Sequence, residues 1–320
     1  MKISFNTLNI DYRKLNKYNG FGNAGNRMID TLESLGYDVS INDHTADVGF
    51  VFNHPRWAMF YPHQYNILYF PWESTELQEG WPTVMDACDE IWTPSNWCKD
   101  IFENFTTTPV YVYEHGVGED WVNRKRYVKD TFNFLNVGAE AARKNGWSVV
   151  RAFRKAFPHN PEVRLTMKML SHVSVPLPPS LGKVTYINER WPLAKLQKEH
   201  YKHHVYVYPS SSEGFGLTPL QAMASGMPTI CTENWAPYAD LLDPDLALHG
   251  TLGTTNWEEI HPGKLFIISE DETIDRMRYA YDNFDSVAQN AYDLAPKVHE
   301  RYNWRTLTAS AFGDLKKRLS

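Results

Sequence analysis

A glycine-rich turn that leads into a helix is the clearest chemical feature of this 320-residue chain. The apolar run Val205–Tyr208 predicts a buried strand, and Gly214-Phe215-Gly216 follows a short turn of Pro and Ser residues. Glycine lets the backbone approach a ligand closely, and the N–H groups and dipole of a helix N-terminus favour an anion. The pattern therefore predicts a diphosphate site, with Glu213 at its mouth as an acceptor of hydrogen bonds from hydroxyl groups.

The helix after this turn has its own start and stop signals. Thr218 suits the N-cap, and Gln221 is spaced to close a capping box onto Thr218. Gly226 and Pro228 end the helix before the next predicted strand, Thr229–Cys231. The whole stretch thus predicts strand, turn, helix and strand in sequence, with the ligand at the first turn.

The same residues carry a resemblance to a known family. Pro209-Ser210, Glu213-Gly214-Phe215-Gly216-Leu217 and Ala222-Met223-Ala224-Ser225-Gly226-Met227-Pro228 resemble the donor-site signature of the retaining GT-B glycosyltransferases of family 4, the glycosyl transferases group 1. Other segments look like those of small phage or bacterial members. The resemblance implies an α/β fold of two Rossmann-like domains, each with a doubly wound parallel sheet, that face a central cleft. It also implies a metal-independent hexosyltransferase that uses a UDP- or GDP-sugar as co-substrate and needs no cofactor.

The resemblance assigns contacts with the donor residue by residue. Glu213 would contact hydroxyl groups of the donor sugar, and the amides of residues 215–217 would contact sugar and phosphate. The family's second acid, which binds the ribose, is replaced here by Gln221, and an amide still hydrogen-bonds a diol without charge assistance. For Gln221 the ribose role and the capping box are equally open. The expected donor-binding residues are Gly214, Phe215, Gly216, Leu217, Thr218, Gln221, Gly20 and Gly22.

Gly20 and Gly22 belong to a second glycine-rich stretch, residues 20–25, which has the spacing G-x-G-x-x-G. Eleven residues separate it from the end of the predicted strand Lys2–Leu8, whereas a dinucleotide fingerprint needs the turn immediately after the strand. We therefore do not expect a dehydrogenase. In the resembled family a glycine-rich loop at this place faces the cleft between the domains.

Two adjacent basic residues, Arg143 and Lys144, are the expected catalytic cations. A metal-independent transferase needs fixed positive charge where the diphosphate leaves, and the pair matches the basic turn after the first strand of the family's second domain. Asn145 is inserted before Gly146, and Ala139 stands where the family often carries another arginine. The alternative is a solvated pair at a helix start.

Acceptor-side candidates lie in the first half of the chain. After the predicted strand Asn66–Phe70, where the family commonly has a histidine, this chain has Trp72-Glu73. Glu73 is a candidate base or orienting group for the acceptor hydroxyl, with His54 as the competing candidate; an acid at a helix start is the alternative for Glu73. Three further aromatic residues suit sugar stacking, a membrane surface or simple packing: Trp57, Phe60 and Tyr61.

The elements that position these residues follow from the pattern of the chain. Apolar runs alternate with helical segments, which predicts parallel doubly wound sheets whose functional residues lie beyond the carboxyl ends of the strands. The strands expected in the first half are Lys2–Leu8, Val48–Phe52, Asn66–Phe70, Glu90–Thr93 and Val110–Tyr113. Those expected in the second half are Phe132–Val137, Val163–Met169, Val184–Ile187, Val205–Tyr208 and Thr229–Cys231.

This pattern predicts two domains. Residues 1–128 form the acceptor-side domain, the basic segment Arg124–Lys129 is the linker, and residues 129–302 form the nucleotide-sugar-binding domain. By resemblance, a last helix over about 303–320 packs back on the first domain.

Composition limits the partners. Residues 1–128 hold 10 Lys or Arg and 17 Asp or Glu, whereas duplex DNA and anionic lipids are bound by clustered basic residues. A saccharide or protein acceptor is therefore favoured over a modified DNA base or a lipid. Three cysteines without metal-ligand spacing, no signal peptide and no membrane-spanning apolar run favour a cytoplasmic protein. Two alternatives remain open: a nucleotide-sugar isomerase or epimerase on the same fold, and a non-catalytic sugar-nucleotide-binding protein.

Overall fold

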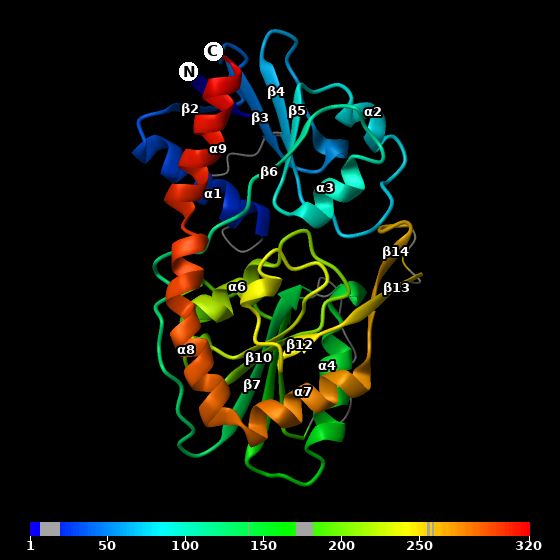
Figure 1. The fold of residues 1–320 in the computed structure, drawn as a ribbon, viewed down its shortest axis with the longest axis vertical. Helices are drawn as coiled ribbons and strands as arrows, with labels where there is room; N and C mark the ends of the chain where they lie inside the picture. The colour runs from blue at the N-terminus through cyan, green and yellow to red at the C-terminus, as the bar shows by residue number, and fades with distance from the viewer. Residues whose placement is uncertain (7–19, 140, 171–181, 255–256, 258) are drawn as a thin grey trace. The chain divides into compact units, whose positions relative to one another are not determined.

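A computed structural model describes residues 1–6, 20–139, 141–170, 182–254, 257 and 259–320 (Figure 1). The chain forms two compact units. Unit 1 consists of residues 1–118, 254–264 and 302–320, and unit 2 consists of residues 119–253 and 265–301. No helix among the described residues is both long enough and apolar enough to cross a membrane.

The sheet of unit 1 has six parallel strands in the order β2-β1-β3-β4-β5-β6. The strands are β1 (Lys2–Phe5), β2 (Asp38–Ile41), β3 (Val48–Phe52), β4 (Tyr65–Tyr69), β5 (Glu90–Thr93) and β6 (Val110–Val112). β3 and β5 have the predicted bounds, and β4 begins and ends one residue earlier than predicted. The last two residues of the predicted strand at 2–8 lie outside the described residues. β2 was not predicted, because it lies at the sheet edge with no fully buried residue.

The helices of unit 1 cover two faces of this sheet. They are α1 (Gly20–Ser34), the 3-10 turn η1 (Pro55–Trp57), α2 (Trp81–Met85), α3 (Asn96–Phe102) and α9 (Trp304–Arg318). Successive strand residues point to opposite faces: Phe50 and Phe52 pack in the core under α1 and α9, whereas Val51 packs in the core under α2 and α3. Ser95 is the N-cap of α3, because its Oγ accepts a hydrogen bond from the amide of Cys98. α9 lies beside α1 (Figure 1).

The sheet of unit 2 also has six parallel strands, in the order β12-β11-β10-β7-β8-β9. They are β7 (Phe132–Ala139), β8 (Val163–Leu170), β9 (Val184–Ile187), β10 (Val205–Tyr208), β11 (Thr229–Thr232) and β12 (Ala247–Leu248). β13 (Gly250–Thr254) and β14 (Lys264–Ile268) form a separate two-stranded sheet. The predicted α/β class with two parallel, doubly wound sheets is therefore confirmed.

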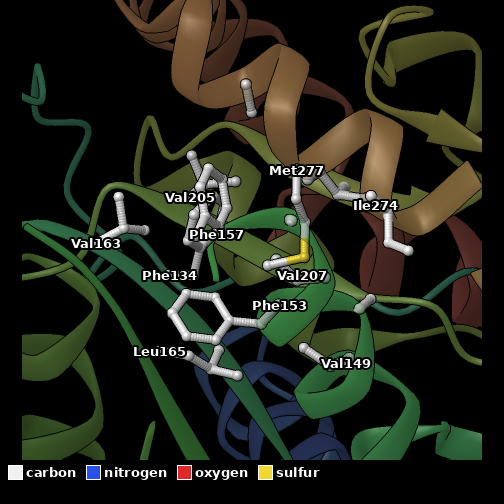
Figure 2. Close-up of a cluster of buried hydrophobic side chains, with 14 of the residues drawn as sticks. Phe134, Val149, Phe153, Phe157, Val163, Leu165, Val205, Val207, Ile274 and Met277 are labelled. Carbon is white, nitrogen blue, oxygen red and sulfur yellow. The ribbon is translucent and has the colours of Figure 1, made fainter. Parts of the chain in front are cut away.

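The helices of unit 2 are α4 (Gly146–Ala156), α5 (Leu193–His200), α6 (Leu217–Ala224), α7 (Glu270–Asp282) and α8 (Phe284–Arg301), with 3-10 turns η2 (Ala142–Lys144) and η3 (Ala239–Leu241). α7 and α8 are separate helices that meet at Asn283. Figure 2 shows the core on one face of the sheet, where Phe153 of α4 and Met277 of α7 pack over Phe134, Leu165 and Val207.

Candidate functional site

The candidate donor site lies where the strand order of unit 2 reverses. β7 and β10 are neighbours, with β8 and β9 on one side and β11 and β12 on the other. Ligands of open α/β sheets bind beyond the carboxyl ends of the strands at such a reversal. Arg143 and Lys144 follow β7, and Glu213 follows β10, so the topology brings together the three catalytic candidates expected in this half of the chain.

These three side chains form one ionic cluster. Nη1 of Arg143 lies 2.7 Å and Nζ of Lys144 3.3 Å from Oε1 of Glu213. The same oxygen accepts hydrogen bonds from the hydroxyl of Tyr208 at 2.7 Å and from that of Ser210 at 3.0 Å. The alternative prediction, that Arg143 and Lys144 are a solvated pair at a helix start, is wrong. Both side chains are ion-paired and largely buried.

The electrostatics of the cluster keep Glu213 ionised. Glu213 is only 7% exposed, and burial alone would raise the pKa of its carboxyl. The charges of Arg143 and Lys144, with the hydrogen bonds from Tyr208 and Ser210, outweigh burial and lower the pKa of Glu213 to about 2. Among the described residues one carboxylate opposes two cations, a surplus of positive charge that suits a diphosphate.

The inserted Asn145 explains how the basic turn is held. Asn145 takes a left-handed conformation with φ 52° and precedes α4, which begins at Gly146. Its Nδ2 donates to the carbonyl of Pro209 at 2.8 Å and to Oγ of Ser211 at 2.9 Å, and the amide of Ser211 donates to the carbonyl of Arg143. The turn after β7 and the turn after β10 are therefore joined as one unit.

The glycine-rich turn ends at Gly216, which is the N-cap of α6 with φ 81°. A Cβ at Gly216 would lie 2.5 Å from both the ring of Trp235 and the hydroxyl of Tyr238, so only glycine fits. The Tyr238 hydroxyl also donates to the carbonyl of Gly216 at 2.7 Å. The first amides of α6, from Leu217 onward, have no acceptor within the helix and suit an anion.

The predicted capping box is wrong. α6 begins at Leu217, so Thr218 is a helical residue and no side chain caps the helix. The backbone turn at Gly216 has taken the place that Thr218 was expected to fill. Gln221 lies within α6 and is 7% exposed, and no hydrogen bond joins its side chain to another described residue. The capping-box role of Gln221 is therefore excluded, and its contact with the ribose of a nucleotide stays a prediction.

Glu73 on unit 1 has a partner that the sequence did not indicate. Oε2 of Glu73 lies 3.9 Å from Nδ1 of His261, and both side chains are about nine-tenths buried. The His261 ring packs on Trp72 with centroids 5.1 Å apart. Trp72 itself is 1% exposed, and its indole N–H donates to the carbonyl of Glu76. Trp72 is therefore a core residue, and the expectation that it contacts an acceptor is wrong.

The other candidates of unit 1 have different surroundings. His54 is half-buried, and its ring packs edge-on against Phe21 and Trp81 with centroids 5.1 and 5.4 Å apart. Gly20 and Gly22 lie in the first turn of α1. The glycine-rich loop implied by the resemblance is therefore helix in this chain, because the stretch continues directly into the amphipathic pattern of α1.

The three aromatic residues of one loop differ in exposure. Trp57 is 46% exposed and carries the guanidinium of Arg56 over its ring at 4.9 Å, whereas Phe60 and Tyr61 are partly buried. Trp57 is therefore the member of this group that is accessible to a ligand.

Sequence reasoning missed several residues of the two candidate sites. Ser210 lies within the quoted signature, and Tyr208 is the last residue of the predicted strand before it. Their place at the carboxyl end of that strand could have indicated that both side chains reach the site. No local signal marked Trp235, Tyr238 or His261, because their roles depend on contacts made across the fold.

A cavity of about 250 Å³ between the C-terminal end of α6 and α8 is a separate feature, lined by Met223, Met227 and Leu294 among others.

Comparison with known proteins finds similarity over part of this chain. Residues 181–283 match the family model described as Glycosyl transferases group 1. An uncharacterized glycosyltransferase of Methanocaldococcus jannaschii, MJ1059, is 25% identical over 122 residues, which are 37% of this chain and 30% of that protein. A probable sucrose-phosphate synthase of Thermosipho melanesiensis is 31% identical over 124 residues, 38% of this chain and 25% of that protein. The matched segments thus cover less than a third of the length of these relatives.

A solved structure covers the whole chain. Anabaena HepE, determined in complex with UDP and glucose, superposes with a TM-score of 0.71 at 11% sequence identity, over 99% of this chain and 100% of that chain. At this identity the likeness concerns the fold. The chain has the GT-B fold of two Rossmann-like domains.

Proposed function

We propose that this protein is a retaining glycosyltransferase that moves a sugar from a nucleotide-diphosphate donor to a hydroxyl group of a saccharide or protein. The observation that carries the proposal is the cluster of Arg143, Lys144 and Glu213 at the strand-order reversal of unit 2. The match of residues 181–283 to the glycosyl transferases group 1 supports it. The complex of Anabaena HepE with UDP and glucose makes UDP-glucose the first donor to test.

The cluster fits the demands of the leaving group. As the bond between sugar and diphosphate breaks, negative charge develops on the phosphate oxygens, and preorganised cations and helix amides stabilise it. Arg143 and Lys144 supply the charge, and the N-terminus of α6 supplies the amides. Arg143 and Lys144 would thus supply the positive charge that a metal ion supplies in metal-dependent enzymes.

Glu213 contributes on the sugar side. The contacts of Glu213 with described side chains all use Oε1, which leaves Oε2 to accept hydrogen bonds from sugar hydroxyl groups. An ionised carboxylate beside the reacting carbon also stabilises the positive charge that develops there. Retention of configuration is proposed from the resemblance of residues 209–228 to retaining enzymes.

The acceptor proposal rests on the charge of unit 1. The ranges that make up this unit contain 12 Lys or Arg and 18 Asp or Glu. Several of its cations are paired with carboxylates, among them Lys2 with Asp43 and Arg318 with Glu90. An acidic surface suits a neutral glycan or a polypeptide better than duplex DNA or an anionic lipid. Glu73 and His54 remain the proposed groups for the acceptor hydroxyl.

The test is transfer of labelled sugar from UDP- and GDP-glucose to separate oligosaccharide, protein and hydroxymethylated duplex DNA acceptors. We expect transfer to a saccharide or protein, with an anomeric configuration by NMR that matches the donor. Efficient labelling of the DNA would overturn the acceptor assignment, and an inverted anomer would overturn the retaining mechanism. An epimerised donor without transfer would indicate an isomerase instead, and a donor that is bound but unchanged would indicate a binding protein.

A further inference from the structure

Tyr208 is the last residue of β10, and its hydroxyl lies between the acid and one cation of the donor cluster. The hydroxyl donates to Oε1 of Glu213 at 2.7 Å and accepts a hydrogen bond from Nζ of Lys144 at 3.0 Å. The residue is 2% exposed, and its ring packs against Tyr206 and Trp235 with centroids 5.9 and 6.4 Å apart. Packing therefore fixes the position of this hydroxyl.

Oε1 of Glu213 is crowded. Four donors converge on it, two from the cations Arg143 and Lys144 and two from the neutral hydroxyls of Tyr208 and Ser210. A carboxylate offers about two lone-pair sites on each oxygen, so all four cannot bind at full strength. An arriving diphosphate competes for the cations, because it carries the same sign of charge as Glu213. The hydroxyls of Tyr208 and Ser210 are neutral, so the diphosphate attracts them less strongly than it attracts the cations. These two hydroxyls therefore keep their hydrogen bonds to Glu213.

We propose that Tyr208 is a positioning residue of the donor site, which keeps Glu213 ionised and in place when the diphosphate of a nucleotide sugar draws Arg143 and Lys144 toward itself. In the free protein Glu213 is the counter-ion of the two cations. In the donor complex the hydrogen bonds from Tyr208 and Ser210 to Glu213 remain. They maintain part of the stabilisation of the ionised carboxylate that is lost when the two cations bind the diphosphate. This inference rests on the proposed function, because it requires a diphosphate ligand at the cluster.

The titration behaviour of the neighbours is consistent with this role. Burial, and then the charge of Glu213, raise the pKa of Tyr208 well above 10, so its hydroxyl stays protonated and able to donate. Tyr206 and Cys231 also feel the charge of Glu213, and burial raises the pKa of both, so they stay neutral. Among the described residues, Arg143 and Lys144 are the charged groups that act on this carboxylate. A proton taken up by the cluster near neutral pH therefore goes to Glu213.

The variant Tyr208→Phe keeps the ring and removes the hydroxyl. In this variant the diphosphate withdraws the cations from a carboxylate that has lost its main neutral donor, so the pKa of Glu213 rises on donor binding. Binding then takes up a proton, and affinity falls as the pH increases. The loss is about tenfold for each unit by which the bound-state pKa exceeds the lowest pH of the measurement. In the wild type, affinity is nearly independent of pH.

The experiment is isothermal titration calorimetry with UDP-, GDP- and ADP-glucose between pH 5.5 and 8, in pairs of buffers with different ionisation heats. These diphosphates are diesters and do not themselves titrate in that range. The matched control is Tyr65→Phe, because the Tyr65 hydroxyl donates at 2.9 Å to Glu90, a carboxylate that Arg318 also binds. Glu90 lies in unit 1, so this control removes the same kind of hydrogen bond away from the donor cluster.

We expect proton uptake and pH-dependent affinity for Tyr208→Phe, a weaker effect for Ser210→Ala, and neither for Tyr65→Phe. The double variant Tyr208→Phe/Glu213→Gln should lose the pH dependence, since glutamine does not titrate. A pH-independent Tyr208→Phe, or a dependence that persists in the double variant, would overturn the role of Tyr208 while the proposed function stands. A wild-type protein that binds none of the three donors would remove the proposed function and this inference together.

Discussion

Arg143 and Glu213 form an ion pair between the turns that follow two neighbouring strands, with 2.7 Å between Nη1 and Oε1 and both side chains only about one-tenth exposed. Desolvation of two charges generally offsets much of their mutual attraction, so such a pair is weak evidence for stability. The ion pair lies at the strand-order reversal, beside the N-terminus of α6. We therefore interpret it as part of an anion-binding site that is already formed without a ligand.

Lys144 should matter for turnover more than for folding. We expect Lys144→Ala to lower kcat by about a hundredfold, the usual effect of losing one preorganised charge stabiliser, with little change in melting temperature. The matched control is Lys155→Ala, because Lys155 also pairs with a glutamate but is well exposed on α4. Near-normal turnover of a folded Lys144→Ala protein would remove Lys144 from the mechanism.

Gln221 should act on the nucleotide. Since the structure shows no capping box, we expect Gln221→Ala to weaken donor binding by several-fold, in line with about 1 kcal/mol for a neutral hydrogen bond, while the melting temperature changes little. Calorimetric binding and thermal unfolding of the same variant check both parts. A loss of stability with donor affinity unchanged would refute the ribose role.

Three buried histidines should make unit 2 sensitive to acid. Burial lowers the pKa of His200 to about 3 and lowers the pKa values of His203 and His204 as well. In the unfolded chain these groups have pKa values near 6.5, so the unfolded state binds more protons below that pH. Stability is therefore complete above about pH 6.5 and falls as the pH decreases, by up to about 1.4 kcal/mol per pH unit for each histidine.

Urea unfolding at pH 7.5 and 5.5 tests this dependence. His200→Phe preserves a ring that can pack on Trp121 and Tyr206 and should reduce the slope of stability against pH. Equal slopes in wild type and variant would show that His200 is not responsible.

Arg318, in the last turn of α9, should contribute to the stability of unit 1. Arg318 binds Glu90 through two hydrogen bonds of 2.6 and 2.8 Å, and Glu90 is 2% exposed. Arg318→Ala leaves a buried carboxylate without its cation, and we expect a loss of about 3–5 kcal/mol, seen as a lower denaturant midpoint. Lys317→Ala is the control, because Lys317 is 81% exposed on the same turn. Equal midpoints for the two variants would contradict this assignment.

The parts of the fold that depend on local pattern could be predicted from the sequence. β3, β5, β9 and β10 have the predicted bounds because each contains apolar residues between turns, and in β3 and β10 every residue is buried. The approach of Glu213 to Arg143 and Lys144 also follows from strand order. The start of α6 could not be read from side chains, because the left-handed backbone of Gly216 replaces the expected cap. The contacts of Tyr208, Trp235 and His261 depend on packing between distant segments, so the sequence around each residue does not indicate them.

The central claim is that the cluster after β7 and β10 binds the diphosphate of a nucleotide sugar. Thermal unfolding of wild type and of Arg143→Ala/Lys144→Ala, each with and without UDP-, GDP- and ADP-glucose, tests it most directly. A donor at about a hundredfold its Kd should stabilise the wild type by roughly 3 kcal/mol, and the double variant should lose most of that stabilisation while it remains folded. If no donor stabilises the wild type, or if the double variant is stabilised equally, the claim is wrong.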